Sequence, residues 1–265
     1  MRWAVCVEYD GGAYHGWQAQ RDVCSVQVTV EAALSQVANH PIRVICCGRT
    51  DTGVHASGQV VHFDSDAERT DHAWVFGANR FLPEDISLRW ACAVPEDFHA
   101  RFAAVTRDYR YLILNHPARS ALYARRASHY RHPLDVDAMH AAGAALQGKH
   151  DFSAFRAAGC QAKSPVRLMH HVRVARHRDF ILIDVRANAF LQHMVRNITG
   201  SLLAVGRGEQ SVDWIAQLLA GGDRRRAGAA APAHGLYFLG PSYPERFELP
   251  ERADPALLMP DKTWI

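Results

Sequence analysis

Lysine is scarce in this chain of 265 residues: 27 of its 30 basic residues are arginine, and the three lysines are Lys149, Lys163 and Lys262. Arginine suits bidentate contacts with phosphate and stacking on nucleic-acid bases. The net charge is only +3, which is a mild indication of a polyanionic partner. A genome rich in arginine codons would produce the same bias, so composition alone leaves both explanations open.

The sequence also lacks the patterns of a disulfide scaffold, a zinc site or a membrane protein. Its six cysteines include no Cys-x-x-Cys pair, and its sixteen histidines show no His-Glu-x-x-His or comparable spacing. The N-terminus has no signal-peptide core, and no apolar stretch is long enough to cross a bilayer. We therefore expect a cytoplasmic protein with reduced thiols, no metal and no membrane association.

Hydrophobic periodicity predicts the order β-α-β-β-α-β in the first part of the chain. The hydrophobic fraction of 48% is enough for a substantial core. The first helix starts at Ser25, which is expected as its N-cap. The expected elements are strand 3–9, helix 25–37, strands 42–47 and 59–63, helix 71–81 and strand 87–93.

The same order recurs in the second part. A hairpin is predicted to turn at Arg178-Asp179, and Asp135 is expected to open a helix. The expected elements are strand 107–114, helix 136–146, strands 167–176 and 180–186, helices 191–205 and 212–219, and strand 235–239.

This repetition predicts an α/β (α+β) protein of two ferredoxin-like halves that share one mostly antiparallel sheet. We place the N-terminal half at residues 1–103 and the C-terminal half at residues 104–265, with residues around 95–105 as the join. The proline-rich tail after Gly240 is expected to be irregular.

The most informative segment is a polar loop between two expected strands, Gly48-Arg49-Thr50-Asp51-Thr52-Gly53-Val54-His55-Ala56. An aspartate kept ionised in such a loop, beside an arginine, can act as a nucleophile. An Asp in a turn is also often only a turn former. Asp51-Thr52-Gly53 matches the aspartic-protease triplet too, whose chemistry needs two carboxylates; the chain has no second copy, although a homodimer could supply one. The polar flanks Arg49 and His55 disfavour that fold, which expects apolar strand residues there.

A resemblance to a known family decides between these alternatives. The loop from Arg49 to Ala56 resembles the active-site motif of the TruA family of tRNA pseudouridine synthases, and ordered matches follow along nearly the whole chain. Two departures are Thr52, where the family usually has alanine, and Gln192, where histidine is common. The matching segments are Tyr9-Asp10-Gly11, Gly16-Trp17-Gln18-Ala19-Gln20, Ser25-Val26-Gln27, Phe98-His99-Ala100-Arg101-Phe102, Arg107-Asp108-Tyr109-Arg110-Tyr111, His150-Asp151-Phe152-Ser153-Ala154-Phe155, Phe190-Leu191-Gln192-His193-Met194-Val195-Arg196-Asn197 and His234-Gly235-Leu236-Tyr237.

The resemblance implies the pseudouridine-synthase fold and an enzyme that isomerises uridine to pseudouridine in the tRNA anticodon stem-loop, at positions 38, 39 and 40. It implies no cofactor and no metal, tRNA as the partner, and a homodimer. The alternatives are a tRNA-binding protein without catalysis and a hydrolase. Fold alone would not choose between them, because ferredoxin-like units carry many activities.

The same resemblance assigns the site. Asp51 is the expected nucleophile, Arg196 its ion-pair partner, and Tyr109 the ring that stacks on the flipped uracil with its hydroxyl near the C5 proton. The expected apolar stripe of the helix leaves Arg196 off its core face. Without the resemblance, Tyr109 would be read as a packing residue and Arg196 as an exposed helix arginine.

Further substrate contacts are expected from Arg49, which would fill the space vacated by the base or bind phosphate, from Arg110, and from Leu236, which would line the uracil pocket. Arginines are also candidates for a wider RNA surface, and the run Arg224-Arg225-Arg226 is expected to be a solvated loop. The candidates for that surface are Arg21, Arg107, Arg110, Arg125, Arg126 and Arg131.

Overall fold

The computed structural model describes residues 1–250 of the chain. The chain forms two compact units. Unit 1 contains residues 1–105 and the described residues from Phe238 onward, and unit 2 contains Thr106 to Tyr237. The expected division differed, because it placed the residues after Tyr237 with the second half. They belong to unit 1 because Phe247 packs in one buried cluster with Ala4, Val60 and Phe98.

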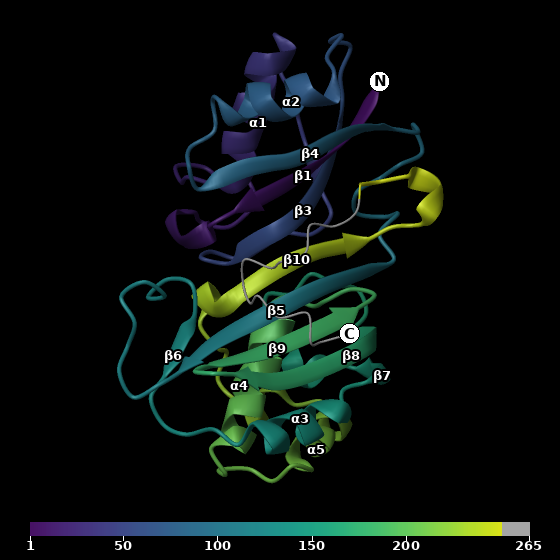
Figure 1. The fold of residues 1–265 in the computed structure, drawn as a ribbon. Helices are drawn as coiled ribbons and strands as arrows, with labels where there is room; N and C mark the ends of the chain where they lie inside the picture. The colour runs from purple at the N-terminus through teal and green to yellow at the C-terminus, as the bar shows by residue number, and fades with distance from the viewer. Residues whose placement is uncertain (251–265) are drawn as a thin grey trace. The chain divides into compact units, whose positions relative to one another are not determined.

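Unit 1 has the predicted order of elements (Figure 1). Its strands run in the order β4-β1-β3-β10, with β2 also paired to β3. The pairs β1–β4, β1–β3 and β2–β3 are antiparallel. The bounds are β1 Arg2–Tyr9, α1 Val26–Ala38, β2 Ile45–Cys46, β3 His55–Asp64, α2 Asp71–Asn79, β4 Ile86–Val94 and β10 Leu236–Ser242, of which the last begins in unit 2.

The helices of unit 1 lie on one face of its strands (Figure 1). Trp74 of α2 is fully buried and packs on Trp3 and Phe63, at ring-centroid distances of 5.8 and 5.0 Å. A β-bulge between Val7 and Tyr9 shifts the register of β1 on β3. A bulge re-aims the side chains that follow it, and here it lies where β1 approaches the loop that carries Asp51.

Ser25 occupies the N-cap position of α1, as predicted, but its side chain makes no capping bond. The first amides of the helix are bonded elsewhere: Val26 N–H donates to Gly16 O and Gln27 N–H to Trp17 O. The loop that precedes α1 therefore serves as its cap, and it is joined to the helix by backbone hydrogen bonds.

Unit 2 repeats the predicted order and adds two short strands, β6 and β7, that were not predicted. Its strands run β5-β9-β8-β7 with antiparallel pairing, and β6 pairs with β5 in parallel. The bounds are β5 Thr106–Asn115, β6 Ser128–Tyr130, α3 Val136–Ala144, β7 Gly148–Asp151, β8 Val166–His177, β9 Phe180–Ala187, α4 Met194–Gly206 and α5 Trp214–Gly221.

Several local predictions in unit 2 are confirmed. The hairpin turns at Arg178 and Asp179, with Arg178 in a left-handed conformation (φ 51). Asp135 caps α3 by accepting from Ala138 N–H at 2.9 Å. The apolar residues of the predicted stripe are buried, although the helix α4 begins at Met194 and not at Leu191; they are Leu191, Met194, Val195, Ile198, Leu202 and Val205.

The two units together give the predicted mixed α/β fold with mostly antiparallel strand pairing. The last short element of the described chain is a turn of 3-10 helix, Glu245–Phe247, so the region after Gly240 is partly regular, contrary to the prediction. The remainder of the predicted irregular tail, residues 251–265, lies outside the described residues.

Candidate active site

The loop of Asp51 is fixed to unit 1 just before the aspartate. Thr50 is buried, and its hydroxyl lies 2.7 Å from the hydroxyl of Tyr9 at the end of β1. The Thr50 carbonyl accepts the Trp17 N–H at 3.0 Å. Tyr9 itself is 3% exposed, and burial raises the pKa of its phenol, so it stays neutral. Both hydrogen bonds therefore join the residue before Asp51 to rigid neighbours.

The two ends of the loop are held as well. Gln59 of β3 donates from Nε2 to the Gly48 carbonyl at 2.5 Å, and its Oε1 accepts from Gly48 N–H at 3.4 Å. At the other end, the buried His55 has Nδ1 at 3.1 Å from Gly11 N and 3.0 Å from Asp10 Oδ1. The loop thus starts and finishes on side chains that are themselves in the core.

The loop of Asp51 also packs directly on the backbone at Gly16. Gly16 has φ +85, and a Cβ placed there would lie 2.7 Å from Thr50 O, 3.1 Å from Asp51 C and 3.2 Å from Thr52 N. Only glycine permits both this conformation and this approach. The Gly16 backbone is therefore in contact with the three residues centred on Asp51.

Asp51 is half-buried in this loop, and its carbonyl accepts the Val54 N–H at 3.1 Å across the turn. Arg49, two residues earlier, is exposed. A partly accessible carboxylate on a braced loop suits nucleophilic attack, because the reacting oxygen can be presented in one geometry. Of the six predicted site residues, these two belong to unit 1.

Tyr109 lies on β5 in unit 2, opposite Val185 of β9. It is half-buried, and its ring meets that of Phe190 edge-on, with centroids 5.0 Å apart and planes at 80°. Two residues along the same face, Tyr111 is fully buried. The Phe190 contact sets the plane of the Tyr109 ring and leaves part of the ring accessible.

Arg196 lies on α4 and is tied to the segment around Ala231 by two bonds: its Nε donates to Ala231 O at 2.7 Å, and its carbonyl accepts Ala231 N–H at 3.0 Å. The next carbonyl, of Pro232, accepts the Tyr111 hydroxyl at 2.7 Å. In unit 2, Arg196 of α4 and Tyr111 of β5 therefore donate to two consecutive carbonyls, those of Ala231 and Pro232. Burial raises the pKa of Tyr111, against the smaller opposing effect of the Arg196 charge.

That approach of α4 to the chain around Ala231 depends on Gly200. A Cβ at Gly200 would lie 1.7 Å from the carbonyl oxygen of Ala229. No side chain can be accommodated there unless the backbone moves. The position of the Arg196 side chain is therefore set by a helix–segment contact that glycine alone allows.

The other predicted contact residues in unit 2 are placed as follows. Arg110 forms a bidentate ion pair with Asp184, at 2.7 and 2.8 Å, and its side chain is only 13% exposed. Leu236 is buried at the start of β10. Arg110 thus has a structural partner, and its role in substrate binding stays a prediction, as does that of Leu236.

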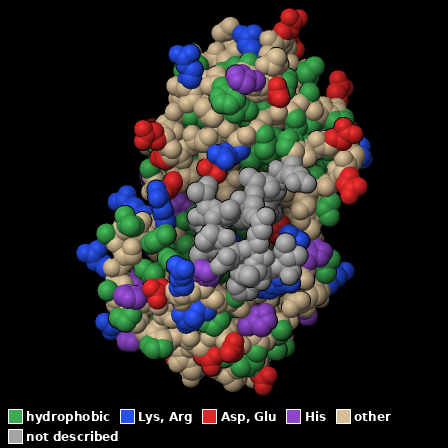
Figure 2. Space-filling model, viewed as in Figure 1, with side chains coloured by type: hydrophobic (Ala, Val, Ile, Leu, Met, Phe, Trp, Pro, Cys, Tyr) green, Lys and Arg blue, Asp and Glu red, His purple; other side chains and the backbone are tan. Residues whose placement is uncertain are grey.

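Among the arginines predicted for a wider RNA surface, Arg21, Arg125, Arg126 and Arg131 are exposed, whereas Arg107 and Arg110 are partly buried. Figure 2 shows basic side chains interleaved with hydrophobic ones on the face of unit 2 near β6. The run 224–226 forms a 3-10 turn, in which Arg224 donates to Asn197 Oδ1 at 2.9 Å. This arginine anchors the turn to α4, so the run is only partly the solvated loop that was expected.

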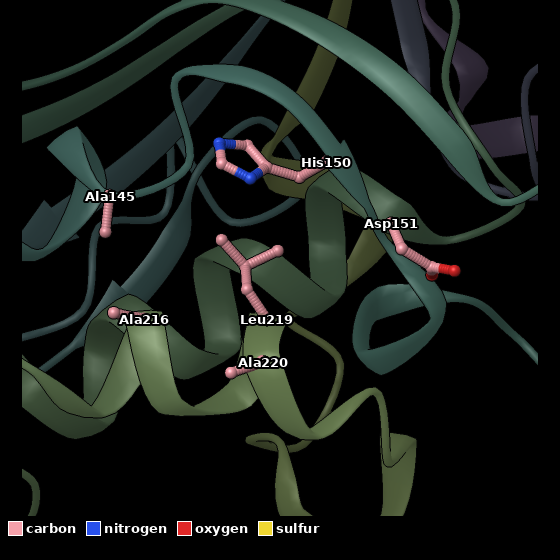
Figure 3. A pocket seen from close by; sticks show the side chains of 6 residues that line it. All are labelled: Ala145, His150, Asp151, Ala216, Leu219 and Ala220. Atoms are coloured by element: carbon pink, nitrogen blue, oxygen red, sulfur yellow. The ribbon is translucent and has the colours of Figure 1, made fainter.

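A shallow hollow in unit 2 contains none of the predicted site residues. In Figure 3 the Asp151 carboxylate turns away from the alanines of the hollow. Asp151 accepts Ser153 N–H at 2.8 Å, and His150 Nε2 lies 2.6 Å from Gln147 O, so both polar groups have local partners. The lining residues are Ala145, His150, Asp151, Ala216, Leu219 and Ala220.

Two further properties concern residues 1–250. No helix in this part combines the length and the apolar character that crossing a membrane requires. Within the same residues, no group of three or more His, Cys, Asp or Glu side chains is placed to hold a metal ion.

Sequence reasoning missed the residues that hold the proposed catalytic groups in place. Tyr9, Gln59 and Gly16 act on the Asp51 loop, and Gly200 acts on the Arg196 segment. The matched segments include Tyr9 and Gly16 but give no reason for their identity. Their contacts with the loop join residues that are far apart in the sequence, so these contacts are visible only in the structure.

Comparison with known proteins shows the family of this chain. The family model described as tRNA pseudouridine synthase matches residues 5–103 and 142–244. Proteins named tRNA pseudouridine synthase A are similar to this chain: those of Vibrio cholerae and Vibrio vulnificus are 55% and 54% identical over 98% of the chain and 99% of their own length. The one from Shewanella amazonensis is 54% identical over 98% of the chain and 100% of its own length. The chain therefore belongs to the tRNA pseudouridine synthase family.

Proposed function

We propose that this protein is an isomerase that converts uridine to pseudouridine in tRNA. The observation that carries the proposal is similarity over nearly the whole chain to enzymes named for this activity, in a chain whose Asp51 loop is braced as a nucleophile requires. The reaction is an isomerisation: the C1′–N1 bond breaks, the base turns, C1′ bonds to C5, C5 loses its proton and N1 gains one. No oxidant, reductant or energy donor enters this balance.

Asp51 is the proposed nucleophile, since it is the carboxylate of the loop that resembles the active-site motif. A stacked uridine cannot reach it, so the base must flip out of the stem, at a cost of roughly a few kcal/mol. The braces at Thr50 and Gly48 support this role because they limit the motion of the loop during attack.

Tyr109 and Arg196 are the proposed partners of Asp51. Arg196 would pair with the carboxylate and hold it ionised, and Tyr109 would stack on the uracil with its hydroxyl close to C5. Their support is the family resemblance, together with the bonds that orient each of them within unit 2. Arg49 and Leu236 are proposed to contact the flipped nucleotide.

The proposed substrate positions are uridines 38, 39 and 40 of the anticodon stem-loop, and the proposed assembly is a homodimer working in the cytoplasm. These details rest on the resemblance. Sequencing of pseudouridine in tRNA from a deletion strain tests the positions, and the molar mass in solution by light scattering tests the dimer.

Activity is tested by tritium release from tRNA labelled at C5 of uridine, in buffer with a chelator. The wild type is expected to release tritium, and Asp51→Asn, nearly isosteric but uncharged, to release none. Asp66→Asn is the matched control, because Asp66 is exposed and lies outside the proposed site. Equal release by Asp51→Asn and wild type would remove Asp51 as nucleophile.

The same assay separates the alternative of a tRNA-binding protein without catalysis. If the wild type binds the transcript but releases no tritium, the protein is a binder and the isomerase proposal fails. Tritium release that occurs without the chelator and stops when the chelator is added would contradict a metal-free mechanism.

A further inference from the structure

One exposed aromatic ring in unit 1 is held out in solvent by an ordered segment. Phe102 is 76% exposed, whereas Phe98, four residues earlier, is fully buried. The Phe102 ring lies beside that of His99, with centroids 4.3 Å apart, and the guanidinium carbon of Arg101 lies 5.6 Å from the centroid of the Phe102 ring. We call these three residues, His99, Arg101 and Phe102, the aromatic platform.

The platform is anchored to the core of unit 1. Phe98 packs against Phe247 and Tyr243, each at a centroid distance of 5.1 Å, and the Tyr243 hydroxyl donates to Ala100 O at 2.6 Å. Ala100 N–H in turn donates to Nδ1 of the buried His62 at 3.1 Å. The segment below Phe102 is thus fixed from two sides.

The platform is also ordered internally. His99 Nδ1 accepts the backbone amides of Arg101 and Phe102, at 3.2 and 3.3 Å. The His99 carbonyl accepts Ala103 N–H at 2.9 Å. Because this turn is hydrogen-bonded throughout, little conformational entropy is left to lose when a ligand stacks on the ring.

The platform lies close to the strand that leads into the Asp51 loop. The His99 ring is 4.7 Å from that of His62, and His62 pairs with Ile45 of β2. The charges of Arg49 and Arg101 both act on the thiol of Cys46, the next residue of β2, although burial dominates and raises the pKa of that thiol to about 12. Arg101 and Arg49, the arginine of the Asp51 loop, therefore both lie near Cys46.

Other exposed rings of unit 1 lack this combination. Phe76 is 59% exposed and stacks on His72. In the described chain, the cation–ring contacts are those of Arg101, Arg207 and Arg246, and none involves Phe76. An exposed aromatic face with an arginine beside it suits a nucleotide, whose base stacks on the ring while its phosphate meets the guanidinium.

We propose that the aromatic platform binds one unpaired nucleotide of the tRNA substrate, with its base stacked on Phe102 and its phosphate on Arg101. The inference rests on the proposed function in naming tRNA as the ligand. It adds a binding subsite outside the catalytic set, and its contribution is to affinity and register and not to the chemical step.

The test is a binding series with an unmodified tRNA transcript, measured as Kd at several salt concentrations. Phe102→Ala is expected to weaken binding roughly 5- to 150-fold, the range for loss of one base–aromatic stack. Phe102→Trp should bind like the wild type, and Phe102→Leu, which keeps apolar bulk without a π face, should be weakened like Phe102→Ala. Phe76→Ala is the matched control and should not differ from the wild type.

Salt dependence separates the two parts of the platform. Arg101→Gln should reduce the slope of log binding constant against log salt by about 0.7 to 0.9, the value for one phosphate contact, while Phe102→Ala should leave the slope unchanged. Thermal unfolding of each variant checks the fold, and Phe102 variants should unfold at the wild-type temperature because the side chain is exposed. Wild-type affinity of Phe102→Ala, or of Phe102→Leu, would overturn the proposal.

Its failure is distinguishable from that of the proposed function. Tritium release by the wild type with unchanged binding by Phe102→Ala would refute the platform alone. The expected binding series without tritium release would support the platform and refute catalysis. In an active enzyme, Phe102→Ala should raise KM and leave kcat near the wild-type value, as expected for uniform binding.

Discussion

Replacing Gly16 by alanine should disturb catalysis through the backbone of the Asp51 loop. An alanine at φ +85 costs about 1–2 kcal/mol, because its Cβ crowds the following carbonyl. The Cβ would also lie 2.7 Å from Thr50 O, where an ordinary contact begins at 3.4 Å. All three atoms that the Cβ would crowd, Thr50 O, Asp51 C and Thr52 N, belong to the backbone, so no rotamer change can relieve the contact.

The loop or the Gly16 turn must therefore move by several tenths of an ångström, and the braces at Tyr9 and Gln59 resist the movement. Overpacking of this kind costs about 1–3 kcal/mol in addition, so we expect a total destabilisation of roughly 2–5 kcal/mol. A displacement of 1 Å at a reacting group can cost about 100-fold in rate, and we expect kcat of Gly16→Ala to fall by about 10-fold or more.

The assay is the rate of tritium release at saturating tRNA, well below the unfolding temperature of each variant. Two glycines serve as controls. A Cβ at Gly48 meets nothing within 4 Å, and Gly48 is not among the residues with positive φ; Gly208 has φ +71 and also meets nothing within 4 Å. Gly48→Ala should therefore change neither stability nor kcat, and Gly208→Ala should lose about 1–2 kcal/mol of stability with normal kcat.

This design separates backbone strain from displacement of the loop. A folded Gly16→Ala protein with the kcat of Gly208→Ala would refute the reasoning, because it would mean that the position of the Asp51 backbone does not limit the rate.

Two further predictions follow from the same structure. Gly200→Ala places a Cβ 1.7 Å from Ala229 O, so the segment that bonds Arg196 must shift, and kcat should fall by about 10-fold or more; Gly159→Ala, whose Cβ would meet only Gln192 Oε1 at 3.7 Å, is the control in the same assay. The pKa of His62 is lowered from 6.5 to about 4, chiefly by burial and then by the charge of His99. Between pH 6.5 and 4, His62 is therefore protonated in the unfolded chain and neutral in the folded protein. Stability should therefore decline as pH falls from 6.5 towards 4, and His62→Asn, which keeps an acceptor for Ala100 N–H, should show a smaller decline in unfolding temperature; an identical decline would contradict this assignment.

The sequence predicts those elements whose signals are local. The stripe of α4 repeats with helical spacing, the β8–β9 hairpin turns at a polar pair, and Asp135 caps the helix that follows it. Each of these depends on residues a few positions apart, so the periodicity and the capping chemistry are sufficient. The order of helices and strands in both halves follows from the same signals.

Elements that depend on distant contacts were not predicted. Ser128–Tyr130 is too short to show alternation, and it becomes a strand only because β5 offers it a parallel partner. The Ser25 side chain makes no cap because carbonyls of the preceding loop already accept the first amides of α1. Phe247 belongs to unit 1 because it packs on Phe98. Its neighbour Arg246 likewise pairs with Asp97, which is 149 residues away in the sequence.

For the candidate site, the resemblance supplied the chemical groups, and the structure supplies the means by which each is held. Nothing near Asp51 in the sequence indicates that Thr50 of its loop forms a hydrogen bond with the Tyr9 hydroxyl, since 41 residues separate Tyr9 from Thr50. Nothing near Arg196 indicates that its guanidinium is oriented by Ala231, 35 residues later. These are tertiary hydrogen bonds, and a single sequence carries no signal for them.

The same physical device recurs in both units: the backbone that carries a proposed catalytic side chain is brought into contact with another stretch of backbone at a glycine. Gly16 meets the loop of Asp51, and Gly200 of α4 meets the segment that binds Arg196. Backbone contacts of this kind cannot relax through rotamers, so they fix a position more firmly than side-chain packing does. Because neither glycine has a side chain that could contact tRNA, their replacement should act on kcat more than on affinity. The platform at Phe102 should show the reverse pattern, and the contrast between the two sets of variants would separate residues that position the chemistry from residues that hold the RNA.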